Sequence, residues 1–149
     1  MKFKYYKIIY PVIALIAVLS IILVINNSVN ASNVQRIEVQ VVGESIIGEQ
    51  YSKELILTRE NGKFFLDFTR VSKDESKFGK NINIKKEITS EVFENFLKIL
   101  KDTKDQGESA LCCDHPFTLI KIVKTSNKSI NKTVAMQPID IEGFFGITD

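Results

Sequence analysis

Apolar and polar residues alternate over short stretches of this chain, which is the pattern of a strand with one buried face. Ile37, Val39 and Val41, for example, are separated by polar residues. Further strands are predicted over residues 54–59, 64–71, 82–88, 117–125, 129–136 and 139–142. Because the links between most of these stretches are short, we expect neighbouring strands to pair in an antiparallel sheet.

The dipeptide Asn61-Gly62 marks a hairpin between two of these strands. Asn-Gly favours a two-residue turn because both central positions need positive φ. Pairing of Glu60 with Lys63 closes the turn with opposite charges. Four apolar side chains then share one face, with Leu55 opposite Phe68 and Leu57 opposite Leu66. The turn and the alternation therefore predict the same register.

The hydrophobic period changes to that of a helix after residue 88. The predicted apolar stripe consists of Phe93, Phe96, Leu97 and Leu100, and Val92 and Ile99 are expected to widen it. Thr89 or Ser90 can cap the amino end, and lysines at 98, 101 and 104 suit the carboxyl end. We expect this helix to lie across the sheet.

These elements predict an α+β domain over residues 32–149, an antiparallel sheet of five to seven strands covered on one face by a single helix. The opposite face is expected to be wet, since it carries Glu38, Gln40, Asp67, Thr69 and Asn83. Phe65 shares that face and is the aromatic candidate for contact with a ligand. Residues 71–81 are predicted to be a polar loop. The aromatic tail around Phe144 and Phe145 is expected to pack on the domain as an edge element; its rival is an exposed peptide.

Residues 1–31 are predicted to be a signal peptide or a signal anchor. Lysines at positions 2, 4 and 7 precede an uncharged apolar run from Ile8 to Ile25, a pattern typical of export. Clustered lysines stay on the cytoplasmic side, so we expect the domain to lie outside the cytoplasm. The run has 18 residues, a length between that of a cleaved signal and that of a transmembrane helix. Two outcomes stay open: anchoring in the membrane by residues 8–25, or release after cleavage near Ala31.

The charge of the chain does not point to a nucleic-acid partner. It carries 20 Lys and Arg against 18 Asp and Glu, and the three N-terminal lysines account for the excess. The remaining residues are close to neutral with mixed charges, so the composition gives no indication of nucleic-acid binding.

The stretch Cys112-Cys113-Asp114-His115 holds both cysteines and the single histidine of the chain. Its cysteines can form a strained disulfide with each other, bond to another chain, bind a metal with His115, or supply a nucleophile with His115 as base. Unreactive structural thiols are the remaining interpretation. We treat Cys112 and Cys113 as candidate redox or disulfide residues, and Asp114 and His115 as a candidate binding loop. No metal site is assigned, because adjacent cysteines lack the spacing that chelates one ion.

No catalytic motif accompanies these residues. Gly-x-Ser-x-Gly, His-Glu-x-x-His and phosphate-binding glycine loops are missing from the sequence. We therefore expect no catalytic residue and no cofactor, and a non-catalytic function: binding of an unknown protein partner in the cell envelope, as inhibitors and immunity proteins do. The alternatives are an exported thiol-redox or metal-binding protein that uses Cys112, Cys113 and His115, and a structural component of the envelope.

Overall fold

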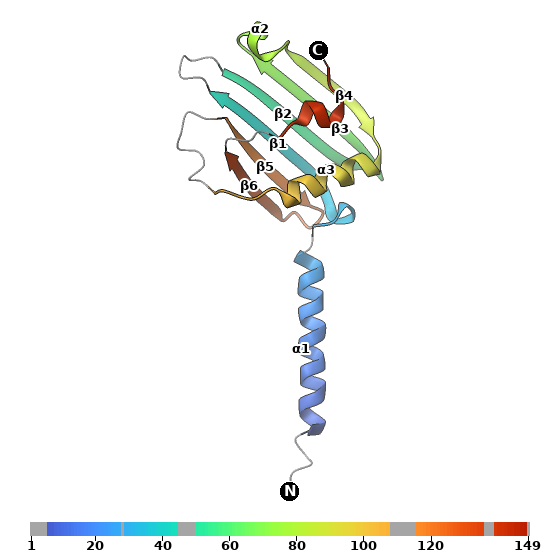
Figure 1. The fold of residues 1–149 in the computed structure, drawn as a ribbon. Helices are drawn as coiled ribbons and strands as arrows, with labels where there is room; N and C mark the ends of the chain where they lie inside the picture. Colours follow the sequence, from blue (N-terminus) through green and yellow to red (C-terminus); the bar gives the residue numbers. More distant parts are fainter. Residues whose placement is uncertain (1–5, 28, 45–49, 108–115, 136–138, 149) are drawn as a thin grey trace.

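The computed structural model of the 149-residue chain describes residues 6–27, 29–44, 50–107, 116–135 and 139–148, without the side chains at 6–9, 21–27, 44, 50 and 135. Figure 1 shows a long helix that extends from a domain made of one sheet and short helices. In chain order the elements are α1 (Tyr6–Asn27), η1 (Ala31–Asn33), β1 (Val34–Glu44), β2 (Gln50–Glu60), β3 (Lys63–Ser72), α2 (Glu75–Phe78), β4 (Ile82–Ile88), α3 (Ser90–Asp102), β5 (Phe117–Lys124), β6 (Ser129–Ala135) and α4 (Ile141–Phe145).

The strands form one antiparallel sheet in the order β4-β3-β2-β1-β5-β6, which confirms the expected antiparallel sheet of five to seven strands. The hairpin has the predicted register, with Glu60 opposite Lys63. Asn61 and Gly62 have φ values of 51° and 79°, as the two-residue turn requires. We call the end of the sheet that carries η1 and this turn the proximal end. The opposite end, where α2 lies, is the distal end (Figure 1).

α3 covers one face of the sheet with its apolar stripe, as expected. Phe93, Phe96, Leu97 and Leu100 are buried in the core. The Thr89 hydroxyl caps the helix by accepting a hydrogen bond from Val92 N at 3.3 Å. Ile99 is 42% exposed, so the prediction that it widens the buried stripe is wrong. It lies beyond the edge of the stripe, on the side of the helix that faces water.

Lys132 of β6 holds the carboxyl end of α3. Its Nζ donates hydrogen bonds to the carbonyl oxygens of Leu100, Lys101 and Thr103, at 2.8, 2.9 and 2.7 Å. These carbonyls are among the last four of the helix or follow it, and such groups have no partner within the helix. A positive charge at this end is also favoured by the helix dipole.

A second short helix, α4, covers the same face, so the prediction of a single covering helix is wrong. The strand predicted over 139–142 is absent as well, because the Asp140 carboxylate caps α4 by accepting from Gly143 N at 2.8 Å. Gly146 ends the helix with φ at 61°. Phe145 is buried, and its ring lies 4.9 Å from that of Phe96. The aromatic tail therefore packs on the domain, as expected, but as a helix.

The predicted polar loop over 71–81 also contains a helical turn, α2. Asp74 caps it by accepting from Ser76 N at 3.0 Å. A short capped turn of this kind needs little apolar periodicity, which is why the alternation of residues did not indicate it.

α1 and η1 precede the sheet. The described side chains of α1, from Tyr10 to Ser20, are all exposed. Among the described residues, no helix combines the length and the apolar character that crossing a membrane requires. Arg59 donates to the Ser32 carbonyl at 2.7 Å, and Val29 and Ala31 pack against the core. Val29 and Ala31 thus belong to the folded domain.

Candidate functional site

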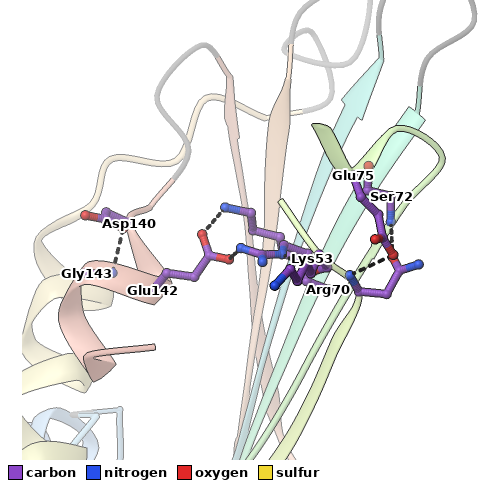
Figure 2. A network of polar contacts seen from close by, with 9 residues as sticks. Lys53, Arg70, Ser72, Glu75, Asp140, Glu142 and Gly143 are labelled. Atoms are coloured by element: carbon purple, nitrogen blue, oxygen red, sulfur yellow. Dashed lines mark hydrogen bonds and ion pairs between the residues drawn. The ribbon is translucent and has the colours of Figure 1, made fainter. Parts of the chain in front are cut away.

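The covered face of the sheet becomes polar near its distal end. Lys53 of β2 and Arg70 of β3 are cross-strand partners, and α4 brings Glu142 over them (Figure 2). Arg70 Nη1 lies 2.5 Å from one carboxylate oxygen of Glu142, and Lys53 Nζ donates to the other. Arg70 is buried, and its Nε also donates to the Lys80 carbonyl at 2.8 Å. One carboxylate therefore bridges two cations and ties α4 to the sheet.

Tyr51 extends this polar region on β2. Burial raises the pKa of its phenol, and the negative charge of Glu142 raises it further. The ring stacks on Phe78 with centroids 4.9 Å apart. It also lies over Gly43 of β1, where an added Cβ would come within 1.9 Å of the ring. A phenol held in its protonated form beside mutually paired charges fits a structural role better than that of a nucleophile.

The sequence-predicted site residues, Cys112, Cys113, Asp114 and His115, lie outside the described residues. The redox, disulfide, metal and nucleophile interpretations therefore stay predictions. The described neighbours lie against β6 and β1, since Gln106 N donates to the Thr133 carbonyl at 2.8 Å and Phe117 pairs with Val42. Over the part of the chain that the structure describes, no group of three or more His, Cys, Asp or Glu is placed to hold a metal ion.

The face of the sheet opposite α3 and α4, here called the open face, is a regular lattice of mostly polar side chains. The five residues predicted to make this face wet are all exposed or half-buried, which confirms that expectation. The central strands contribute Arg36, Glu38, Gln40 and Val42 from β1, Ser52, Glu54, Ile56 and Thr58 from β2, and Phe65, Asp67, Thr69 and Val71 from β3. The outer strands contribute Asn83, Lys85 and Glu87 from β4, Phe117, Leu119, Lys121 and Val123 from β5, and Ser129, Asn131 and Thr133 from β6.

Ion pairs within and between strands organise this lattice. Asp67 lies 2.8 Å from Lys85, and Glu38 lies 3.0 Å from Arg36 and 3.5 Å from Lys121. The hydrogen bond to Asp67, and its negative charge, raise the pKa of Lys85. These pairs are exposed, so each contributes at most about 1 kcal/mol to folding. They can therefore be rearranged at low cost when another molecule binds.

Apolar side chains are interspersed on the open face beside shallow depressions. One depression of about 570 Å³ is lined by Ile56, Phe65, Asp67 and Lys85, among others. Another of about 310 Å³ is lined by Glu38, Gln40, Glu54 and Leu119, among others. Sites for small molecules are usually enclosed and mostly apolar. Open depressions in a mixed surface are better suited to side chains of another macromolecule.

The Lys53–Arg70–Glu142 cluster and the open-face ion pairs were not among the sequence-predicted site residues. The hairpin register already places Lys53 opposite Arg70, and thus two cations on the covered face. Glu142 could not be added to them, because its position depends on the packing of α4. The Asp67–Lys85 pair could have been found from the pairing of β3 with β4.

Comparisons with known proteins do not indicate a function for this chain. No family model, curated protein or solved structure matches this chain. The open face is therefore the candidate functional site, on the strength of its exposure, its lattice of polar and apolar groups and its depressions.

Proposed function

We propose that this chain is a small exported, non-catalytic protein whose domain binds another macromolecule in the cell envelope, in the manner of an inhibitor or immunity protein. The open face is the observation that carries the proposal. It is a broad surface of a six-stranded sheet that neither α3 nor α4 covers, and its groups are suited to contact rather than to bond making. Apolar residues with a polar, solvent-accessible rim are typical of protein interfaces.

Export is supported by the N-terminal pattern and by α1. The apolar run over 8–25 follows three lysines. Leu15 and Ile16 of α1 are 61% and 58% exposed, and the described side chains of this helix, from Tyr10 to Ser20, are not buried on the domain. An exposed apolar surface of this kind is suited to contact with a membrane during export or afterwards. The proposal includes both retention by residues 8–25 and release near Ala31.

A fusion reporter tests export. A reporter that is active only outside the cytoplasm, joined after Asp149, should be active. Activity of a cytoplasm-only reporter at that position would overturn export. The mass of the mature chain then distinguishes the two outcomes, because cleavage near Ala31 gives a chain that starts at Ser32.

Paired substitutions test binding by the open face. The 32–149 chain and the full chain are each used to capture partners from envelope extract. Phe65→Ala and Glu54→Ala remove open-face side chains, whereas Lys98→Ala removes an exposed side chain on α3 as a matched control. The amount of partner captured should fall at least about tenfold for each of the two open-face variants, and it should stay unchanged for the Lys98→Ala control. Equal capture by all variants, with unchanged melting temperatures, would reject the open face as the binding surface.

A further inference from the structure

The Asn61-Gly62 turn determines which backbone groups point outward at each edge of the sheet. In a two-residue hairpin the flanking residues, here Glu60 and Lys63, bond to each other through both backbone groups. Backbone groups then alternate sides along each strand, so the even-numbered residues of β3 bond to β4. The same alternation can be followed from each strand to its neighbour across the sheet. It leaves the backbone groups of the odd-numbered residues of β4 and of β6 pointing outward, away from the sheet.

The chain itself contacts the β6 edge at Thr133, a position that agrees with this alternation. Thr133 N donates to the carboxylate of Asp105 at 2.9 Å, and Gln106 N donates to the Thr133 carbonyl at 2.8 Å. Both outward groups of Thr133 are thus used by the segment that follows α3. The chain therefore covers the β6 edge at this position.

The β4 edge, meaning the outward backbone groups of Asn83, Lys85 and Glu87, has no such cover within the described residues. No hydrogen bond from any described segment reaches these three N–H and three C=O groups. Ile82, Ile84 and Ile88 are only partly buried against the core, so apolar surface remains beside the edge. An uncovered strand with these properties is a template for another strand.

Charge at the β4 edge selects the kind of strand that it accepts. Full antiparallel pairing with a second copy would place residue 82 opposite residue 88, and therefore Lys85 opposite Lys85. Like charges directly opposite each other are unfavourable. Lys80, Lys85 and Lys86 outnumber Glu87 here, and the Lys85 side chain is 72% exposed. The edge is therefore repelled by its own copy and complementary to carboxylates.

We propose that β4 is the docking edge for an extended acidic segment of a protein partner, which adds to the sheet as a further strand. This proposal rests on the proposed binding function, and it names a surface and a partner chemistry. Carboxylates of the segment face Lys85 on the open face. Its apolar residues lie beside Ile82, Ile84 and Ile88.

Hydrogen exchange of the full chain in detergent, with a synthetic peptide, tests the proposal. The probe is a capped seven-residue peptide of alternating valine and glutamate, and the control replaces glutamate with lysine. The acidic peptide should slow exchange of the Asn83, Lys85 and Glu87 amides at least about tenfold, because each gains a hydrogen bond. Exchange at Ile84 and Lys86, already bonded to β3, should change little. Protection that is absent from the three outward amides, or that is equal with the basic peptide, would overturn the proposal.

A substitution pair separates backbone pairing from charge. Lys85→Pro removes the central outward N–H while leaving the bonds between β3 and β4, and Lys85→Ala removes the same charge but keeps the N–H. Affinity for the acidic peptide should be at least about tenfold lower for Lys85→Pro than for Lys85→Ala. Equal affinities in two folded variants would exclude strand addition. If Lys85→Pro fails to fold, the hydrogen-exchange pattern of the wild-type chain with the two peptides still tests strand addition. Partner capture that depends on Phe65 but not on Lys85 would defeat this inference and leave the binding function standing.

Discussion

Replacement of Glu142 by glutamine tests how the C-terminal segment is held on the sheet. The Glu142 carboxylate accepts from both Lys53 and Arg70. In Glu142→Gln the amide oxygen can accept from one of these cations, but the NH₂ group is itself a donor. One cation then faces a donor in a mostly buried site, and both lose their counter-charge.

The burial of the three side chains determines the size of the effect. The side chains of Arg70, Glu142 and Lys53 are 7%, 16% and 24% exposed. Removal of one member of a buried ion pair costs about 3–5 kcal/mol, whereas exposed pairs contribute about 0–1 kcal/mol. Because Lys53 still reaches water, we expect the lower end of the buried range, a loss of about 3 kcal/mol in the free energy of unfolding.

Urea unfolding at neutral pH measures this loss. Glu94→Gln, at an exposed position of α3, is the matched control and should change stability by less than about 0.5 kcal/mol. Lys53→Met added to Glu142→Gln should recover part of the loss, since it removes one uncompensated cation. A loss below about 1 kcal/mol for Glu142→Gln would refute the bridging role. Strict additivity of the two substitutions would refute it as well.

Other substitutions test the rest of the framework. Lys132→Met should lower the free energy of unfolding by about 2 kcal/mol, because three carbonyls at the end of α3 lose a charged donor; an unchanged urea midpoint would contradict this. Gly62→Val should cost at least about 1 kcal/mol, seen as a lower melting temperature, because φ is 79° there and β-branched residues resist positive φ. Hydrogen bonds from Thr133 N and Gly107 N lower the pKa of Asp105, so its carboxylate stabilises the fold above its unfolded pKa. The stability difference between wild type and Asp105→Asn should therefore shrink as pH falls below about 4, and a difference that is constant across that range would exclude the linkage.

The sheet could be predicted from the sequence because its signals are local. Alternation over β2 and β3 and the turn between them agree on one register, and the structure has that register. Thr89 and the apolar stripe after it defined α3 in the same way. Each of these elements depends on residues close together in the chain, so tertiary contacts did not need to be known.

The C-terminal segment could not be predicted because its local signal is ambiguous. Alternation over 139–142 suits a strand, but it is too short to distinguish a strand from one helical turn. The helix is stabilised by the Asp140 cap and by the contact of Phe145 with Phe96. That contact depends on a residue nearly fifty positions earlier in the chain. Glu142 was therefore not among the predicted site residues, although the register of the β2–β3 hairpin places Lys53 opposite Arg70.

The open face and the β4 edge meet at Lys85, and this suggests how one partner can use both. The backbone of Lys85 points outward from the sheet, while its side chain lies on the open face against Asp67. The depression that contains Phe65 is lined by the same Asp67–Lys85 pair. A strand added at the edge would bring its carboxylates to Lys85, and would thereby release Asp67 toward the depression. A partner that docks by strand addition would therefore change the charge of the open face where its own side chains arrive, so that the two contacts reinforce each other.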